Sequence, residues 1–455
     1  MKSLTIEQTK ADDKQYVLHS WSKQKNLNPK SISKAEGVFF WDENEKRYFD
    51  MCSQLVYLNV GHNHPKLLEE FKQIGEIPMA APAFATASKS ELARKIIEKA
   101  PDNMAKVFFT CGGAESNDHA IKIARMATGR YKIFSRYRSY HGATFGAGNL
   151  TGEGRRFMVE PGIPGFIKFD TPYLYKEVID FSSEEEAVAF YLDRLKNQML
   201  YEGPESIAAV FMEPIPGSNG VIIPPKGYLE GVRELCDQFG ILMICDEVMT
   251  GFGRTGKMFA VDHFDFEPDM ITFAKGVTSG YSPLGGVIVS EKVARYFDEN
   301  TLMTGLTYSG HTVSTQIGCA TLDLLEEEKI VENAARAGEI LAQRLDALLS
   351  FDSVGQVRHI GLFAAVELVK DKATKEPIIS YGMDYGKDPV GLMSKFVSLL
   401  SENGFYTYSH ESSVIIAPPL IISEQELNEA MDIFEKVLRN FEQEYLFADK
   451  TLTVK

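Results

Sequence analysis

The chain has 455 residues, 44% of them hydrophobic, which is enough for a large core and favours more than one domain. It carries 48 basic and 63 acidic residues, and the resulting net charge of −15 argues against nucleic acid as a partner. The sequence shows neither a signal-peptide core nor an uncharged apolar run of membrane-spanning length, and its five cysteines lack CxxC spacing. We therefore expect a cytoplasmic protein with free thiols and no membrane contact.

The first elements expected along the chain are a helix within the polar residues 1–35 and a hairpin over residues 38–51, with DENE as its turn. From about Pro65 onward, helix-period segments alternate with short apolar runs: KVFFT, YKIFS, AAVFMEP, ILMICDE, MITFAK and GGVIVS. Because these runs are apolar throughout, they are typical of strands buried on both faces. Alternating strands and helices predict an α/β fold in which helices cover a mainly parallel sheet.

The pattern changes after about Ala334, where strand-like segments precede one amphipathic helix. These segments are VRHIGLFAAVELV, FYTYS and SSVIIAPPL, and SEQE is a capping box that opens the final helix. We predict a large α/β domain over residues 61–334, which holds the cofactor argued for below, and a smaller α+β domain over residues 335–455. The N-terminal segment, residues 1–60, is predicted to join the smaller domain.

A glycine-rich loop, GFGRTG at residues 251–256, matches two phosphate-loop fingerprints but has the structural context of neither. Met258 stands where a P-loop needs a serine or threonine, and DEVMT separates the loop from the strand that a Rossmann fold would require directly before it. We expect these glycines to serve tight backbone turns. A nucleotide-dependent enzyme that uses this loop is kept as the alternative from a different functional class.

A better phosphate site follows the run KVFFT, where CGG makes a sharp turn into the predicted helix AESNDHAIKIARMATG. The backbone N–H groups of Gly113 and Ala114 lie at the start of that helix, where the helix itself provides no acceptor for them. Such a turn suits a dianionic phosphate, while an ordinary helix start explains part of the same pattern.

Two other apolar runs end in charged side chains, because ILMIC is followed by Asp246 and ITFA by Lys275. The carboxyl ends of parallel strands share one edge of a sheet, so Asp246, Lys275 and the Gly113 turn are predicted to face one crevice. A lysine at the end of a buried strand is costly without a partner or a function, and one such function is a Schiff base with a carbonyl group. A phosphate, a protonated pyridine nitrogen and an aldehyde carbon are the three groups that pyridoxal 5′-phosphate offers to such a crevice.

The chain resembles the class III (ω-amino acid) aminotransferases, which are pyridoxal-phosphate enzymes of fold type I. The resemblance covers about residues 35–435 and rests on motifs in the family's order: CGGAESNDHAIKIAR, SYHG, MEPI, ICDEVMTGFGRTG, ITFAKGVTSGYSPLGG, TYSGH and APPL. The segment CSQLVYLNVGHNHP is most similar to the branch that acts on taurine, β-alanine and related ω-amino acids. The resemblance implies a large domain with a mainly parallel sheet and a smaller α+β domain.

The resemblance implies three catalytic residues. Lys275 would form the Schiff base with the cofactor and then move the substrate proton as general base and acid. Asp246 would pair with the ring nitrogen and keep it protonated, and Glu213 would lie close to cofactor and substrate. The alternative interpretations of these positions are a strand-end lysine, a capping aspartate and a buried structural glutamate.

The cofactor contacts are also implied by the resemblance. The implied residues are Gly113, Ala114, Tyr140, His141, Asp246, Val248, Lys275 and Thr307. Tyr140 and Val248 would cover the two faces of the ring, and His141 would support the segment of Tyr140. Thr307 would reach the cofactor phosphate of the other subunit, which requires a homodimer with shared active sites. Tyr140 and Val248 are equally compatible with core residues, and Thr307 with a helix cap.

On the substrate side, the sequence departs from the family pattern. Family members often carry an arginine a few residues before PPL, and His410 stands at that position here. An arginine grips a carboxylate through two hydrogen bonds and a histidine does not, so carboxylate recognition is left open, with Arg155 or Arg156 as a contributor. Val56 stands where many relatives have a bulky aromatic, which predicts a roomier pocket. The predicted substrate contacts are Val56, Arg156 and His410.

We therefore predict transfer of an amino group by a ping-pong cycle, from an ω-amino acid, a taurine-like aminosulfonate or an amine to pyruvate or 2-oxoglutarate. An aminomutase, racemase or decarboxylase of the same fold is the nearest alternative. A non-catalytic scaffold is disfavoured by the intact Lys275 and Asp246. His62 and His64 in GHNHP lack a third ligand-like neighbour, so we expect no metal site.

Overall fold

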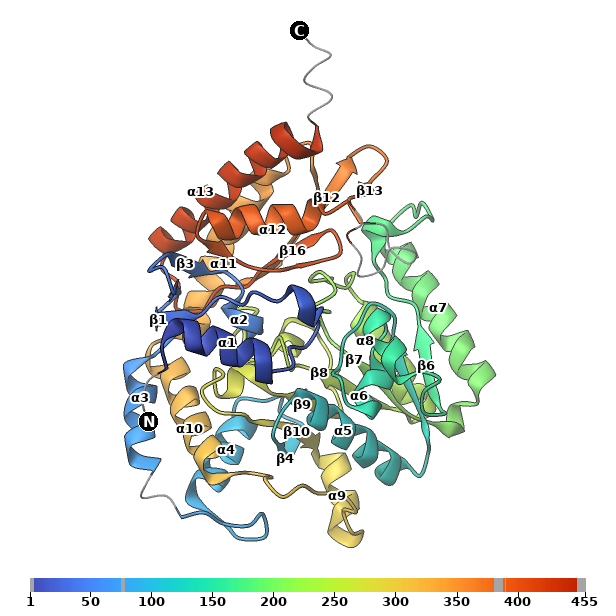
Figure 1. Ribbon diagram of the computed structural model, residues 1–455. Coiled ribbons are helices and arrows are strands. Elements are labelled where there is room, and N and C mark those ends of the chain that lie inside the picture. Colours follow the sequence, from blue (N-terminus) through green and yellow to red (C-terminus); the bar gives the residue numbers. More distant parts are fainter. Residues whose placement is uncertain (1–3, 75–77, 380–387, 389, 448–455) are drawn as a thin grey trace.

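The computed structural model describes residues 4–74, 78–379, 388 and 390–447. Within this part of the chain, a seven-stranded sheet forms the centre of the molecule (Figure 1). Its strands, in spatial order, are β4 (Met104–Thr110), β10 (Gly285–Ser290), β9 (Met270–Phe273), β8 (Leu242–Asp246), β7 (Ile207–Met212), β5 (Lys132–Arg136) and β6 (Phe166–Phe169). The pairs from β9 through β8, β7 and β5 to β6 are all parallel. The predicted α/β fold with a mainly parallel sheet is therefore confirmed.

Strand β10 is the exception, because it runs antiparallel to both β4 and β9. The segment between β9 and β10 holds only the short 3₁₀ helix η7 (Lys275–Val277), whereas a parallel pairing would need a longer crossover. With β10 reversed, β4, β8 and β9 still point the same way. The register pairs Thr110 with Gly285, Phe273 with Gly286, and Asp246 with Thr272. The carboxyl ends of these three strands consequently meet at one edge of the sheet, as the sequence predicts.

Helices surround the sheet, which explains why every residue of β7, β8 and β9 is buried. The helices of this part are α3 (Pro65–Gln73), α4 (Ala87–Ile97), α5 (Gly113–Thr128), α6 (Phe145–Leu150), α7 (Glu184–Glu202), α8 (Tyr228–Phe239), α9 (Glu291–Glu299) and α10 (Thr312–Glu327). Short helical turns lie at η3 (Gly154–Val159), η4 (Leu174–Lys176), η5 (Pro204–Ser206) and η6 (Ala260–His263).

The C-terminal part packs a second sheet against helices at the top of Figure 1. Its strands are β11 (Val354–Ile360), β12 (Phe363–Asp371), β16 (Ser413–Ile416) and β15 (Ser409–His410), with β13 (Glu376–Pro377) paired to β12. Its helices are α11 (Ile330–Leu348), α12 (Leu392–Glu402), α13 (Glu424–Phe441) and the short η8 (Glu442–Leu446). Helix α13 begins at the predicted capping box, in which Ser423 and Glu426 each bond the other's backbone N–H.

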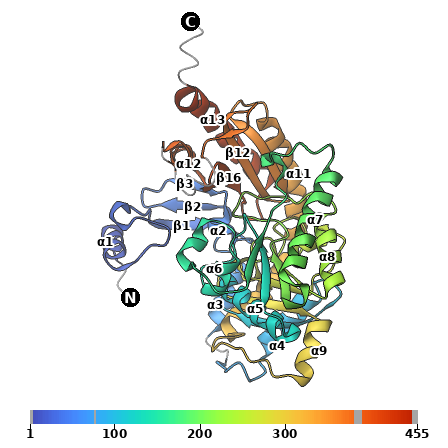
Figure 2. The same ribbon diagram turned by 90° about the vertical axis from the view of Figure 1, so that its right-hand side faces the viewer.

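The N-terminal part forms a third sheet that includes one strand from the C-terminal part. Its order is β1 (Ile32–Glu36), β2 (Phe39–Asp42), β3 (Arg47–Asp50) and β14 (Phe405–Tyr406), and β2 with β3 is the predicted hairpin. Figure 2 shows these strands and α1 (Ile6–Tyr16) projecting to one side of the molecule. The remaining short helices are η1 (Gln24–Asn26) and α2 (Ser53–Val56).

The domain boundaries stay a prediction, and residues 1–3 and 448–455 at the ends of the predicted small domain lie outside the described residues. Among the helices that are described, none combines the length and the apolar character that crossing a membrane requires.

Candidate active site

The amine of Lys275 lies at the edge where the parallel strands end. Lys275 follows β9 and has a left-handed backbone with φ of +46°, a conformation that L-residues rarely adopt outside constrained sites. Burial lowers the pKa of its amine to about 8, while the charges of Asp246 and Glu213 act in the opposite direction. The amine therefore lies within reach of the charges of both predicted catalytic carboxyls, and a larger fraction of it is neutral near physiological pH than for an ordinary lysine.

The carboxylate of Asp246 is fixed by three donors. Its Oδ2 accepts from Nδ1 of His141 at 2.7 Å and from Nδ2 of Asn117 at 2.8 Å, and its Oδ1 accepts from the backbone N–H of Val248 at 3.0 Å. The residue is only 4% exposed. Asn117, which also donates to the carbonyl of His141 at 2.6 Å, was missed by the sequence reasoning. The sequence did offer one signal for Asn117, namely its position on the predicted helix, one helical turn after Gly113.

The turn before α5 offers unpaired backbone N–H groups at a helix start. The helix begins at Gly113, and its N-cap residue Gly112 has no side chain with which to cap it. A Cβ built on Gly113 would lie 2.7 Å from Cγ1 of Val248, so the turn and Val248 are in close contact. Amides at a helix start and a nearby fixed carboxylate fit the phosphate and the pyridine nitrogen of pyridoxal phosphate, and the Lys275 amine fits its aldehyde.

We expect Gly113→Ala to weaken pyridoxal-phosphate binding by about tenfold or more, because the new methyl group displaces either the turn or Val248. Gly112→Ala is the matched control. Gly112 has an extended backbone with φ of −178°, and a Cβ there meets no atom within 4 Å. Equilibrium dialysis of both variants against the cofactor measures the effect. Equal affinities for the two variants would contradict the assignment of this turn to the phosphate.

A hydrogen bond connects Tyr140 to Glu213 at the end of strand β7. Glu213 follows β7, and its Oε2 accepts from the N–H of Tyr140 while its Oε1 accepts from the N–H of Gly217, both at 3.3 Å. Burial raises the pKa of Glu213 to about 7. The half-buried ring of Tyr140 stacks on the guanidinium of Arg155, whose Cζ lies 3.7 Å from the ring centroid.

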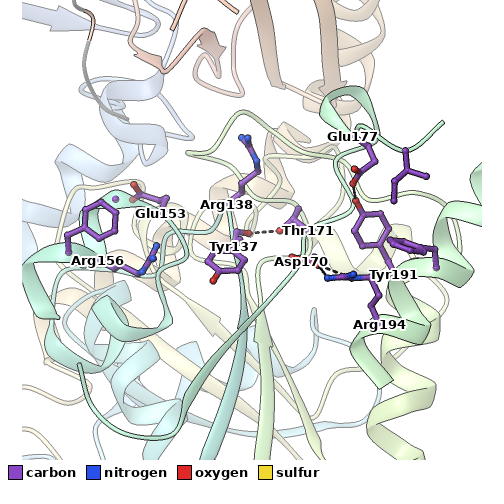
Figure 3. Close-up of a pocket in the computed structure, with 13 residues that line it drawn as sticks. Tyr137, Arg138, Glu153, Arg156, Asp170, Thr171, Glu177, Tyr191 and Arg194 are labelled. Atoms are coloured by element: carbon purple, nitrogen blue, oxygen red, sulfur yellow. Dashed lines mark hydrogen bonds and ion pairs between the residues drawn. The ribbon is translucent and has the colours of Figure 1, made fainter. Parts of the chain in front are cut away.

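Three further predicted site residues have other surroundings. Val56 is 1% exposed and packs in an apolar cluster with Ile215 and Phe363, a placement that favours a packing role. Arg156 pairs with Glu160 at 3.0 Å and lies in a separate cavity of about 540 Å³, drawn in Figure 3. Thr307 lies in the loop before α10 and is exposed in the single chain.

His410 occupies the position of the family's arginine, on β15. Burial, and after it the positive charges of Arg155 and Arg138, lower the pKa of its imidazole to about 3. The imidazole is therefore neutral at physiological pH. It offers a hydrogen-bonding group at this position but no charge to match a carboxylate.

The arginine of the GFGRTG loop makes structural hydrogen bonds. Arg254 is fully buried and donates to the carbonyls of Leu362 and Pro418, to Oγ of Ser53 and to Oδ1 of Asn59. One side chain thereby connects the large part of the molecule to its N- and C-terminal parts. Arg254 is committed to these four acceptors, which leaves its guanidinium unsuited to a nucleotide phosphate.

Comparison with known proteins identifies the class. The family model described as aminotransferase class-III matches residues 21–438. The chain is 35% identical over 431 residues to the putrescine–pyruvate aminotransferase of Pseudomonas aeruginosa, covering 91% of this chain and 92% of that protein. It is 32% identical over 450 residues to the taurine–pyruvate aminotransferase of Bilophila wadsworthia, covering 95% and 97%.

Among solved structures, a similar one is the taurine:2-oxoglutarate aminotransferase from Bifidobacterium kashiwanohense in complex with pyridoxal phosphate and glutamate. It is 46% identical, with a TM-score of 0.94, and the match covers 98% of this chain and 100% of that one. The chain belongs to the class III aminotransferases. It is an aminotransferase that uses pyridoxal phosphate, as the motifs of its sequence predict.

Proposed function

We propose that Lys275, Asp246 and Glu213 are the catalytic residues of this aminotransferase. The observation that carries the proposal is the lysine amine with a lowered pKa, close to two buried carboxyls at the edge where three strands end. When bound, pyridoxal phosphate supplies an aldehyde carbon that accepts amines and a ring that withdraws electrons. Lys275 Nζ holds the cofactor at that carbon and moves the proton of the substrate's amine-bearing carbon.

The other proposed catalytic residues, Asp246 and Glu213, hold and orient the groups around the lysine. Asp246, fixed by His141, Asn117 and the N–H of Val248, receives the pyridine nitrogen and keeps its proton in place. Glu213 keeps Tyr140 in position through its backbone N–H, and its own pKa of about 7 allows it to hold a proton close to the substrate.

The cofactor is proposed to lie between Tyr140 and Val248, with its phosphate on the amides of Gly113 and Ala114. Thr307 of the partner subunit would add a hydroxyl to this phosphate, which makes the active enzyme a homodimer. The exposure of Thr307 in the single chain supports a surface that a partner covers. We also propose a cytoplasmic location, which the free cysteines support.

For the substrates, we propose an ω-amino acid or a taurine-like aminosulfonate as donor and pyruvate or 2-oxoglutarate as acceptor. The two relatives whose names state taurine as the donor support this choice, and one of them is the solved structure reported above. The putrescine-converting relative makes a diamine the second candidate donor.

A donor panel tests the proposal. The cofactor-loaded enzyme is incubated with taurine, β-alanine, 4-aminobutyrate, putrescine or phenylethylamine, each with pyruvate or 2-oxoglutarate. We expect taurine or β-alanine to be converted fastest, and a single turnover without acceptor to leave the cofactor in its amino form. Recovery of an isomerised or decarboxylated donor with unchanged cofactor would instead indicate an aminomutase, racemase or decarboxylase.

A further inference from the structure

The guanidinium of Arg254, in the GFGRTG loop, is a buried positive charge that no carboxylate pairs with among the described residues. Its four hydrogen-bond acceptors are uncharged, and its Nε meets no acceptor in this part of the chain. The carboxylate whose charge acts on it, Asp50, is bonded to Gln54 and His62 instead. A buried charge without such a pair costs stability, so we looked for a function beyond the cohesion of the fold.

The loop of Arg254 lies directly against the backbone that follows Lys275. A Cβ built on Gly276 would lie 2.5 Å from Nδ2 of Asn59 and 3.1 Å from Cβ of Phe252. Asn59 is itself held in place, because it donates to the carbonyl of Phe252 at 2.9 Å and accepts from Nη2 of Arg254 at 3.0 Å. The guanidinium therefore fixes the side chain that packs against the residue after Lys275.

The segment of Asn59 also holds the far end of this turn, residues 275–280. The N–H of Val60 donates to Oγ of Ser279 at 2.9 Å. Lys275 and Ser279 both have left-handed backbones, with φ of +46° and +51°. Because L-residues keep such conformations only where their surroundings impose them, the turn depends on the segment that the guanidinium fixes.

The charge of Arg254 also acts on the lysine amine. Asp246 and Glu213 raise the pKa of the Lys275 amine. Arg155 and Arg254 lower it, in addition to the larger effect of burial, because nearby cations disfavour the protonated form. Removal of either cation should therefore favour the protonated form.

We propose that Arg254 is a positioning residue of the active site, which holds the Lys275 turn through Asn59 and keeps a positive charge near the amine. The proposal rests on the proposed function, since it presumes that Lys275 binds the cofactor. Arginine suits this position because its planar fork reaches four acceptors, whereas a lysine carries three donors on one atom. The glycine-rich loop thereby serves the reaction through the lysine.

The effect of the charge is tested by titrating the cofactor-loaded enzyme with acid and base. The absorbance of the bound cofactor changes with protonation of the imine that joins it to Lys275, so the midpoint reports the charges around that nitrogen. In Arg254→Met we expect the midpoint to move to higher pH by about half a unit or more, because a cation is removed. In Arg254→Lys, which keeps the charge, it should stay within about 0.2 units of the parent.

Arg233→Met is the matched control, because Arg233 is a largely buried arginine far from the amine. It pairs with Asp269, which lies just before β9, at the end of the strand opposite to Lys275. We expect this variant to unfold at a lower temperature and to titrate like the parent. An unshifted midpoint in Arg254→Met, or an equal shift in Arg233→Met, would overturn the proposal.

The positioning role is tested by combining Arg254→Lys with Asn59→Ala, which also keeps the test independent of whether Arg254→Met folds. Each single variant should slow the first half-reaction about tenfold at saturating taurine, or at saturation with the fastest donor of the panel. The double variant should be no more than about threefold slower than the slower single one, since both act through one contact.

Losses that multiply in the double variant, or parental rates in both single variants, would contradict a role through Asn59. Thermal unfolding of every variant shows whether a slow reaction merely reflects a less stable chain. Conversion of none of the amines by the unsubstituted enzyme would instead overturn the proposed function, while the titration would still decide whether the charge of Arg254 acts on Lys275.

Discussion

Replacing Lys275 by alanine is expected to lower turnover by a factor of about 10³ or more, because the residue both holds the cofactor at its reactive carbon and moves the substrate proton. The low pKa of its amine, about 8, leaves a neutral base available near physiological pH. The fold should be unaffected, since removing a strand-end amine that burial disfavours costs little stability. Initial rates with taurine and 2-oxoglutarate, together with thermal unfolding, measure both expectations.

Lys122→Ala provides the control, because Lys122 is an exposed lysine on α5 and should be replaceable without loss of rate. A second readout does not depend on turnover. After borohydride treatment of the loaded enzyme, peptide mass spectrometry should find the cofactor on the peptide that contains Lys275, and on no peptide of the Lys275→Ala variant. Parental turnover in that variant, or a cofactor fixed to another lysine, would show that the assignment is wrong.

The sheet and the predicted crevice could be derived from the sequence because their signals are local. Runs such as ILMIC and ITFA are almost entirely apolar, as is typical of a strand covered on both faces, and the carboxyl ends of parallel strands share one edge of the sheet. The hairpin over residues 38–51 and the capping box at Ser423 depend on neighbours within a few positions.

The contacts that the sequence did not predict depend on side-chain direction and on segments far apart in the chain. Arg155 and Arg156 are adjacent and identical in type, yet η3 directs one onto Tyr140 and the other onto Glu160. Asn117 contacts Asp246 because the fold packs α5 against β8, which is far from α5 in the sequence. Val56, whose contact with the substrate stays a prediction, has a left-handed backbone with φ of +56° and a side chain packed in an apolar cluster, and neither feature follows from its neighbours in the sequence.

Asp246→Asn is expected to lower turnover by about 10² or more, since it removes the negative charge proposed to hold the proton on the pyridine nitrogen. The amide cannot satisfy all present donors. If its oxygen accepts from His141 and Asn117, its NH₂ group faces the N–H of Val248, and two donors meet. We therefore expect weaker cofactor binding as well, measured by dialysis alongside the absorbance of the bound cofactor and the rate of the first half-reaction.

Glu247→Gln separates the loss of function from the general cost of changing a buried carboxyl. Glu247 is fully buried next to Asp246, and its oxygens accept from the N–H groups of Ala260 and Val261 and from the hydroxyl of Thr250. Its amide would also face a backbone donor, so we expect a lower melting temperature but turnover within about threefold of the parent. Because both substitutions replace a carboxyl by an amide at adjacent buried positions, a comparable loss of turnover in both would mean that Asp246 acts through the fold. A loss confined to Asp246→Asn would place its charge in the reaction.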